Sequence, residues 1–210
     1  MSHSLYHTEG IILGSWPSGE TSRLFDIFTN RLGRVMAMAT GVRELKSKLR
    51  YHLQDLAAVQ VSLVRGRGPW RIVHAETIQS RFNLDITKSR FDLGQEKVEP
   101  FDLVERQTIA RIFKLLARLI IDEGRRRTVW REVFGAYHFL AQTSFTPVEL
   151  ADFELLVVWR ILTALGYCEN SVTLAPFAVR PWDKLLISDF NPARQAALLI
   201  VEQALYHSHL

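Results

Sequence analysis

The sequence predicts an α+β protein of two domains, a small N-terminal β-barrel followed by a C-terminal all-α helical domain. The hydrophobic period changes along the chain: residues before Phe82 form short strand-like runs separated by turns, and residues after Asp102 follow helical spacing. An excess of positive charge confined to the strand-rich part is the second observation. We expect the first domain at residues 1–81 and the second at 82–210, with a polar linker at about 83–100.

The first eighty residues contain five strand-like runs and one short helix. Leu45, Leu49 and Leu53 recur every four residues and predict a helix of one to two turns, whereas Trp16–Gly19 and Arg65–Pro69 have the composition of turns. The predicted strands are Tyr6–Ser15, Ser22–Thr29, Gly33–Ala39, Leu53–Val64 and Trp70–Gln79. Five strands with a helix between the third and the fourth is the order of an OB-fold barrel.

The second half of the chain has the spacing of a helical bundle. Apolar stripes run through residues 109–119 and 130–141. Thr146-Pro147-Val148-Glu149 is a capping box with proline at the first helical position, and Gly166 stands where that helix should end. Because this helix is apolar nearly all round, we expect it at the centre of the bundle. Asn191-Pro192 opens a last helix.

Positive charge is concentrated in the strand-rich part of the chain. The whole protein carries +4, whereas residues 31–71 hold nine Lys/Arg against two Asp/Glu, a net of +7. Four of these cations fall within Arg43–Arg50, directly after the third predicted strand. A surface that collects one sign of charge suits a polyanion, and nucleic acid is the usual one. A solvated helix face is the alternative, but such a face mixes signs, so phosphate binding is favoured.

The cations of this segment converge if the third strand, the helix and the 65–69 loop share one side of the barrel. The expected phosphate ligands are Arg34, Arg43, Lys46, Lys48, Arg50, Arg65, Arg67 and Arg71. Trp16, Tyr51 and Trp70 are candidates for stacking on bases, which is how OB-folds often hold single strands. Core packing is an equally good interpretation of each, because large aromatic side chains often fill a small barrel.

A second basic cluster, Arg125-Arg126-Arg127, follows Gly124, and Arg131 lies one turn further on. One interpretation is that these arginines complement the C-terminal dipole of the preceding helix. The other is a dock for an acidic peptide or a second DNA contact, with Trp130 and Phe134 supplying apolar surface beside the charge. The sequence favours neither.

No pattern in the sequence predicts catalysis, a metal or a cofactor. Cys168 is the single cysteine, which excludes an intramolecular disulfide and an all-cysteine metal site. The seven histidines are scattered, and neither a Gly-rich phosphate loop with lysine nor a nucleophile elbow occurs. No run of eighteen apolar residues predicts a membrane span, and the N-terminus lacks a signal-peptide pattern. We therefore expect a cytoplasmic, non-enzymatic protein.

Motifs in residues 5–80 resemble the bacterial RecO family of recombination mediators, which are DNA repair proteins. The first strand contains Thr8-Glu9-Gly10-Ile11-Ile12-Leu13, and Gly19-Glu20-x-x-Arg23-Leu24 follows at the turn. Next come Phe28-Thr29-x-x-x-Gly33 and the fairly specific Gly41-x-Arg43-x-x-Lys46-Ser47-x-Leu49-x-x-x-Leu53-Gln54. The helical half is similar to the family more weakly, through Phe153-Glu154-Leu155-Leu156 and Leu165-Gly166-Tyr167.

The resemblance implies binding of single- and double-stranded DNA and annealing of complementary strands, at the bacterial nucleoid. It also implies partners: RecR, the acidic C-terminal tail of single-stranded-DNA-binding protein, and RecA indirectly. Two departures matter. Many family members continue past the Leu-Gly pair with a four-cysteine zinc site, of which only Cys168 is present here. Thr40 stands where the family usually has lysine, which removes one expected phosphate contact.

Two other classes of function fit the same residues. A protein-interaction adaptor would use the helical domain to hold its partner and would have negligible affinity for nucleic acid. An RNA-binding OB-fold protein would prefer RNA over DNA of equal length. A titration of single-stranded DNA against RNA at two salt concentrations separates these classes from a DNA mediator.

Overall fold

The computed structural model describes residues 4–66, 68–79, 103–121, 123–124, 126–168 and 171–207. The chain divides into two compact units. One comprises Met1–Arg106 with Leu119–Arg126, and the other Gln107–Arg118 with Arg127–Leu210. The expected linker at 83–100 lies outside the described residues, so the boundary after residue 81 stays a prediction. No helix in the described part of the chain has the length and apolar character to cross a membrane.

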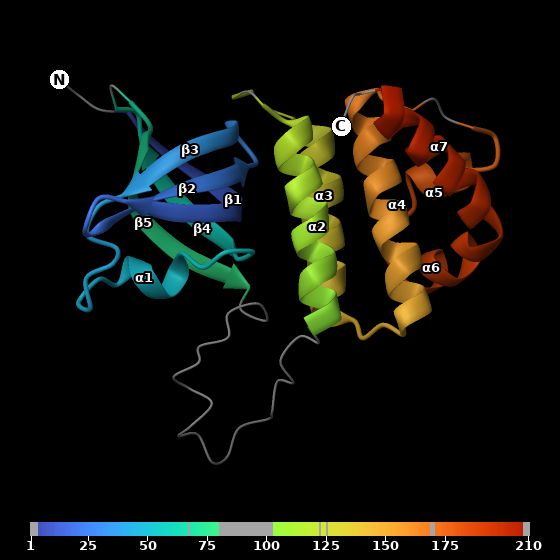
Figure 1. Cartoon of the computed structure of the whole chain (residues 1–210), viewed down its shortest axis with the longest axis horizontal. Helices are drawn as coiled ribbons and strands as arrows, with labels where there is room; N and C mark the ends of the chain where they lie inside the picture. Colours follow the sequence, from blue (N-terminus) through green and yellow to red (C-terminus); the bar gives the residue numbers. More distant parts are fainter. Residues whose placement is uncertain are drawn as a thin grey trace, which may run out of the picture. The chain divides into compact units, whose positions relative to one another are not determined.

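Five strands of the first unit close into a barrel in the order β1-β2-β3-β5-β4 (Figure 1). The strands are β1 Leu5–Ser18, β2 Ser22–Thr29, β3 Gly33–Ala39, β4 Ala58–Val64 and β5 Trp70–Gln79, with the short helix α1 Leu49–His52 between β3 and β4. All pairings are antiparallel except that of β3 with β5, which is parallel and places Met38 beside Arg71. The predicted OB-fold barrel is confirmed.

Three predicted boundaries differ from those of the structure. Trp16 and Pro17 continue β1 instead of turning, since they pair with Leu24 and Arg23 of β2. The fourth strand begins at Ala58, because residues 53–57 form a tight turn. The helix before it has only the four residues of α1.

Alternate residues of the strands fill the barrel. Phe25, Ile27, Val35 and Ala37 point inward, and Trp70 closes the set from β5. Because side chains on a strand alternate between faces, the residues between them point outward. This alternation decides which polar and apolar side chains of β2 and β3 reach the outer surface of the barrel.

The segment after helix α2 (Leu103–Leu119) packs on the barrel at the start of β3. The backbone N–H of Gly124 donates to the carbonyl of Leu32 at 2.9 Å, and Gly33 forms a β-bridge with Glu123. Gly33 has a φ of +73°, and a Cβ at this position would overlap the backbone of Gly124. Glycine is therefore required here for both conformation and space.

The second unit is a helical bundle around α4 (Pro147–Leu165). Its other helices are residues 107–118 of α2, α3 Arg127–Gln142, α5 Ala175–Ala178, α6 Lys184–Phe190, a 3₁₀ turn Asn191–Ala193 and α7 Arg194–His207. Helix α4 packs against α3, α6 and α7, which confirms its predicted central place (Figure 1). Thr146 caps it through the predicted capping box, and Gly166 ends it. The short helices α5 and α6 were not predicted.

A buried arginine organises the chain between α5 and α6. The guanidinium of Arg160 donates to the carbonyls of Phe177 and Arg180 and lies 4.3 Å from the Trp182 ring centroid. Trp182 also packs tightly on Gly135, where a Cβ would lie 2.9 Å from its ring. The buried Phe177 and the Trp182 ring therefore hold this segment on the bundle, whereas Leu185 is mostly exposed.

Candidate nucleic-acid interface

The loop between β3 and α1 is anchored on the tip of the β1–β2 hairpin. Gly41 makes a turn at a φ of +67°, and the N–H of Glu44 donates back to its carbonyl at 3.1 Å. The backbone N–H of Arg43 donates to the carbonyl of Thr21 at 2.9 Å, and its side-chain Nη1 donates to Gly19 at 3.0 Å. These bonds hold the basic loop against the hairpin and fix where Arg43 emerges.

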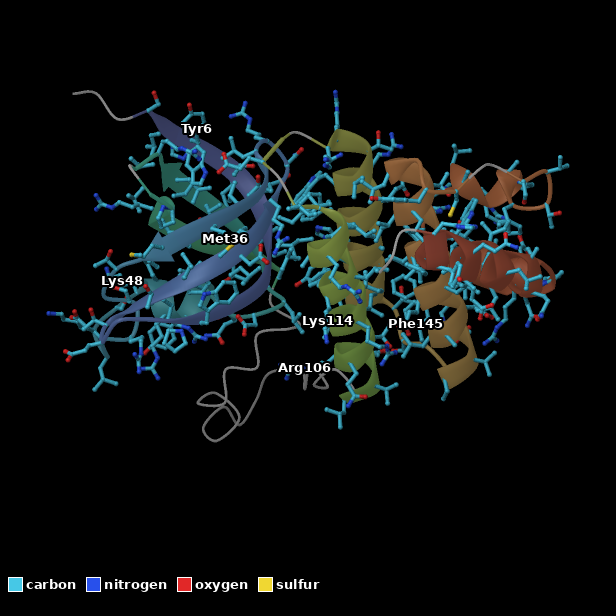
Figure 2. All side chains as sticks on the ribbon, turned by 45° about the horizontal axis from the view of Figure 1, so that its top comes forward. Tyr6, Met36, Lys48, Arg106, Lys114 and Phe145 are labelled. Atoms are coloured by element: carbon cyan, nitrogen blue, oxygen red, sulfur yellow. The ribbon has the colours of Figure 1, made fainter. Side chains whose placement is uncertain are left out.

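Apart from Arg65, five of the predicted phosphate ligands are exposed on the barrel unit: Arg43, Lys46, Lys48, Arg50 and Arg71. Lys46 lies 3.3 Å from Glu44, in an exposed pair of the kind that contributes little. Within the described residues, Lys48, Arg50 and Arg71 form no ion pair. Figure 2 labels Lys48 at the outer edge of this unit, where the side chains extend away from the ribbon. The structure thus leaves these cations available to an anion.

Arg34 does not belong to this group, and the expectation for it is revised. Its Nε and Nη2 donate to the two carboxylate oxygens of Asp26 at 2.9 and 2.8 Å, and its Nη1 donates to the carbonyl of Ile120 at 2.8 Å. Asp26 is almost fully buried. A guanidinium bound in this bidentate way is neutralised and positioned by the protein itself.

Arg65 is also engaged, and Arg67 lies outside the described residues. The Nη1 of Arg65 lies 2.7 Å and 2.8 Å from the two oxygens of Glu123. Arg34 and Arg65 therefore both contact residues 120–123, whereas the loop cations lie at the hairpin tip and α1. The seven predicted ligands among the described residues do not converge on one surface as the sequence suggested.

An apolar row crosses the outer face of the barrel beside the basic loop. Trp16 pairs with Leu24, Leu24 with Met38, and Met38 with Arg71, so the four side chains share one face of β1, β2, β3 and β5. With strands about 4.8 Å apart, the row is roughly 14 Å long. Trp16 is 43 % exposed. Met36, labelled in Figure 2, lies on the same face of β3.

The three predicted stacking residues differ in how accessible their rings are. Trp16 and Tyr51, which is 54 % exposed on α1, present accessible rings. Trp70 is only 5 % exposed, because its ring closes one end of the barrel and meets Tyr6 edge-on at 5.2 Å. The core interpretation therefore holds for Trp70, and we withdraw it as a stacking residue.

One residue near the interface was missed. Arg23 pairs in register with Pro17 and Ala39 at the hairpin end of the barrel, and its buried Nε has no hydrogen-bond partner among the described residues. Its guanidinium lies 6.0 Å from the Phe25 ring centroid. The motif Gly19-Glu20-x-x-Arg23 was the only signal for it, since charge counting over residues 31–71 begins beyond this position.

The second basic cluster lies at the start of α3. Arg125 is outside the described residues, Arg126 is half-buried, and Arg127 is the exposed first residue of α3. Arg127 stands at the positive end of the α3 dipole, which does not favour a cation, and its expected interaction with the C-terminus of the preceding helix stays a prediction. Trp130 is buried and stacks on Phe134 at 4.8 Å, so it offers little free apolar surface.

Arg131 lines a cavity of about 330 Å³ in the helical unit. The wall combines the apolar Trp159 and Val179 with the charged Glu132 and Arg160. Glu132 lies between the two arginines, 3.2 Å from the Nε of Arg131 and 3.3 Å from the Nη1 of Arg160. Burial lowers the pKa of Arg160, and the charge of Glu132 opposes this shift. The cavity therefore carries a net positive charge beside apolar surface.

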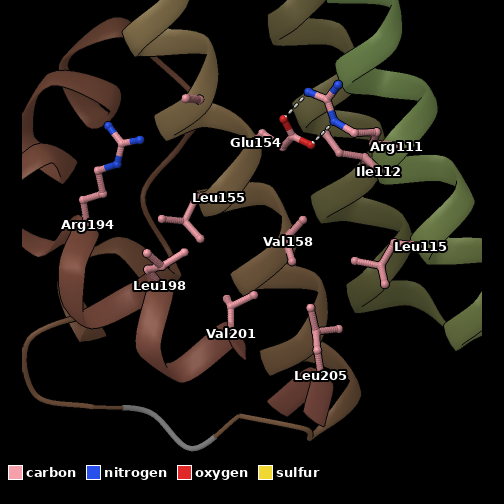
Figure 3. A pocket seen from close by; sticks show the side chains of 11 residues that line it. Arg111, Ile112, Leu115, Glu154, Leu155, Val158, Arg194, Leu198, Val201 and Leu205 are labelled. Carbon is pink, nitrogen blue, oxygen red and sulfur yellow. Dashed lines mark hydrogen bonds and ion pairs between the residues drawn. The ribbon is translucent and has the colours of Figure 1, made fainter. Parts of the chain in front are cut away.

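A second cavity, of about 390 Å³, lies between α2, α4 and α7 (Figure 3). Its lining is mainly apolar: Ile112, Leu115, Leu155, Val158, Leu198, Val201 and Leu205. Arg111 and Arg194 stand at its rim, but each has a carboxylate partner. Arg111 binds Glu154 through hydrogen bonds of 2.7 and 2.6 Å, and Arg194 lies 3.2 Å from Asp152.

Metal-binding side chains do not gather anywhere in the described part of the chain: no group of three or more His, Cys, Asp or Glu could hold an ion there. Cys168 is buried, and burial raises the pKa of its thiol. A buried thiol of this kind is a poor nucleophile, because the thiolate is the reactive form.

The barrel has the topology of the OB-fold, a class in which many members hold nucleic acid by charge and stacking, and it carries a basic loop beside an exposed apolar row. Residues 1–81 match the family model described as the N-terminal part of recombination protein O, RecO. Among relatives named DNA repair protein RecO, that of Nocardioides sp. is 32 % identical over 199 residues, which cover 90 % of this chain and 70 % of the relative. This chain belongs to the RecO family.

Other relatives with the same name match shorter stretches. That of Gloeothece citriformis is 30 % identical over 149 residues, 68 % of this chain and 52 % of the relative. That of Dehalococcoides mccartyi (strain CBDB1) is 38 % identical over 79 residues, 38 % of this chain and 31 % of the relative. The chain thus spans about half the length, or less, of several curated relatives that it matches.

Proposed function

We propose that this protein is a non-enzymatic DNA-binding mediator of recombination and repair, and that its barrel holds the DNA. The observation that carries the proposal is the juxtaposition of the anchored basic loop, residues 40–48, with the apolar row that begins at Trp16. Membership of the RecO family supports the choice of DNA over other polyanions. Such a protein would act in the bacterial cytoplasm, at the nucleoid.

Phosphate contacts supply most of the binding free energy in this proposal. Arg43, Lys46, Lys48, Arg50 and Arg71 are the five exposed cations assigned to these contacts, and Arg23 is a further candidate. If all five contact a single strand, the slope of log affinity against log salt is about −3.5. Contacts of this kind do not depend on sequence, and they serve double-stranded DNA as well.

Bases of a single strand stack on Trp16 and pass over Leu24 and Met38, with Tyr51 as a second ring on α1. Stacking of this kind tolerates any base, because each base has a π-face. A protein that neutralises two phosphate backbones without locking the bases allows complementary strands to pair. We therefore propose strand annealing, which should need neither nucleotide nor magnesium, and assistance in loading RecA.

The helical unit is the proposed partner-binding part. An acidic C-terminal tail, as in single-stranded-DNA-binding protein, needs cations for its carboxylates and an apolar pocket for its last side chain. The cavity beside Arg131 combines both properties, because its two arginines share the single carboxylate of Glu132, whereas each rim arginine of the cavity in Figure 3 has a carboxylate of its own. We place the tail at the Arg131 cavity and assign RecR as a further partner without assigning its surface.

The DNA proposal is tested by titrating labelled single-stranded DNA at several salt concentrations. Changing Arg43, Lys46, Lys48 and Arg50 to Ala should flatten the salt slope from about −3.5 to about −1 and weaken binding by several kcal/mol in sum. Changing Lys114, Arg118 and Arg127, exposed cations of the helices, is the control and should alter the slope much less. An unchanged slope in the loop variant would remove the loop from the interface. Tighter binding of RNA of the same sequence would favour the RNA-binding alternative.

The partner proposal is tested with an acidic tail peptide. Charge reversal at Arg127 and Arg131 should abolish peptide binding and leave binding of naked single-stranded DNA largely intact. Arg118→Glu is the matched control, because Arg118 is equally exposed but lies on α2. Peptide binding that survives the double reversal would place the dock elsewhere.

A further inference from the structure

Two donors of the barrel converge on one carboxylate oxygen. The Nη1 of Arg65 and the indole Nε1 of Trp70 lie 2.7 and 3.1 Å from Oε1 of Glu123. The guanidinium of Arg65 also lies 4.8 Å from the Trp70 ring centroid, so the indole both orients the arginine and donates beside it. Trp70 is almost fully buried, which makes its N–H a fixed donor. This is the geometry of a receptor for an anionic oxygen, filled here by a side chain of the same protein.

The carboxylate can leave without disturbing the backbone that carries it. The side chains of Arg65 and Glu123 are each about half exposed, at 52 % and 48 %, and exposed pairs contribute only about 0–1 kcal/mol. The backbone is held separately, by the bond from Gly124 to Leu32 and by that from Arg34 to Ile120. Rotation of one glutamate side chain is therefore enough to empty the receptor.

A phosphate oxygen fits the emptied receptor, and the barrel places it beside the proposed DNA path. Guanidinium and indole N–H groups are donors only, so the ligand must be an acceptor, and the positive charge favours an anion. Arg65 directly follows Val64, which pairs with Arg71, the cation at the end of the row that starts at Trp16. A strand lying along that row brings its next phosphate toward Arg65.

We infer that Arg65 and Trp70 form a phosphate subsite for the nucleic-acid backbone, and that Glu123 fills it in the free protein as an internal competitor. The inference rests on the proposed DNA-binding function. It makes the expected role of Arg65 conditional. The arginine contributes to DNA binding only when the Glu123 side chain has rotated away. Glu123 thereby lowers the affinity for DNA and reduces the number of phosphates bound.

The test compares Glu123→Ala with Glu76→Ala, an exposed carboxylate of β5 whose loss changes the net charge equally. At about 0.1 M salt, Glu123→Ala should bind single-stranded DNA about threefold more tightly than Glu76→Ala and steepen the salt slope by about 0.7, one added phosphate. In an Arg65→Ala background the same change should give no gain. A gain that persists without Arg65, or equals that of Glu76→Ala, overturns the subsite.

A spectroscopic readout separates this inference from the proposed function. The indole N–H resonance of Trp70, assigned with Trp70→Phe, should shift when single-stranded DNA or inorganic tripolyphosphate is added to Glu123→Ala. DNA that binds the loop without moving this resonance would leave the function standing and remove the subsite. If tripolyphosphate moves the Trp70 resonance through Arg65 in a protein that binds no DNA, the subsite would stand and the proposed function would be removed. A shift only at tripolyphosphate concentrations above about 0.1 M would mark an adventitious ion only and would also overturn the subsite, because ions at such concentrations occupy exposed cations without a built site.

Discussion

Asp26 on β2 and Arg34 on β3 face each other diagonally across the outer surface of the barrel and are joined by two hydrogen bonds of 2.9 and 2.8 Å. Arg34 carries one of the nine positive charges that pointed to a polyanion, yet its charge is balanced within the fold. We therefore expect the Asp26–Arg34 pair to stabilise the barrel, whereas the loop cations remain available to bind an anion.

Arg34→Ala should destabilise the barrel and leave the DNA contacts unchanged. Asp26 would stay buried without its partner, at a cost of about 2–3 kcal/mol, because hydrogen bonds to charged groups are worth about that much. Arg50→Ala, an exposed control, should cost less than about 0.5 kcal/mol. Denaturant unfolding and the salt slope for single-stranded DNA measure the two effects. A flatter slope with unchanged stability in Arg34→Ala would return this residue to the interface.

Trp16→Ala should weaken binding of single-stranded DNA by about 1–3 kcal/mol, the usual loss of one base–aromatic stack. Duplex affinity should change much less, because the bases of a duplex are already stacked on one another. Tyr206→Ala removes an even more exposed aromatic, on α7, and serves as the control. Equal losses for single strands and duplexes would show that Trp16 shapes the barrel rather than stacks on bases.

Arg160→Met should cost about 3–5 kcal/mol in the free energy of unfolding of the helical unit. The change leaves the carbonyls of Phe177 and Arg180 unbonded and Glu132 without its buried partner. Arg111→Met removes a bidentate pair with Glu154 in which the arginine is about half exposed, so it should cost less than about 1 kcal/mol. Urea unfolding compares the two variants, and equal losses would contradict an organising role for Arg160.

Asp152 should make the helical unit less stable as pH rises through the acidic range. Burial raises the pKa of this carboxyl above its ordinary value of 3.8, and Arg194 only partly opposes the shift. The folded state therefore holds the proton more tightly than the unfolded state, so this contribution to stability falls above pH 3.8 and levels off past the folded pKa.

Asp152→Asn should remove that fall, so its stability relative to the wild type should be higher at about pH 7 than at about pH 3. Asp189→Asn, which changes an exposed carboxylate paired with Arg180, is the matched control and should show no such trend. Thermal unfolding across the pH range gives the comparison. A parallel pH dependence for wild type and Asp152→Asn would mean that Arg194 fully compensates for the burial.

Local patterns predicted the elements that local chemistry controls. The alternation of Val35, Ala37 and Ala39 in β3 and the capping box at Thr146 were confirmed, because each depends on residues a few positions apart. The exposed loop cations Arg43 to Arg50 could also be predicted from local sequence, because few acids that could pair with them stand nearby. The order of five strands and one helix was enough to predict the OB-fold.

Strand register and distant partners decided the rest. Trp16 became part of a continuous row, and Trp70 part of the core, only because β1 pairs with β2 and β5 closes the barrel. Arg34 is bound by the backbone of Ile120 and Arg65 by the carboxylate of Glu123, residues more than fifty positions away in the chain. Charge is a property of the sequence, but whether a charge is free depends on what the fold places within hydrogen-bonding distance.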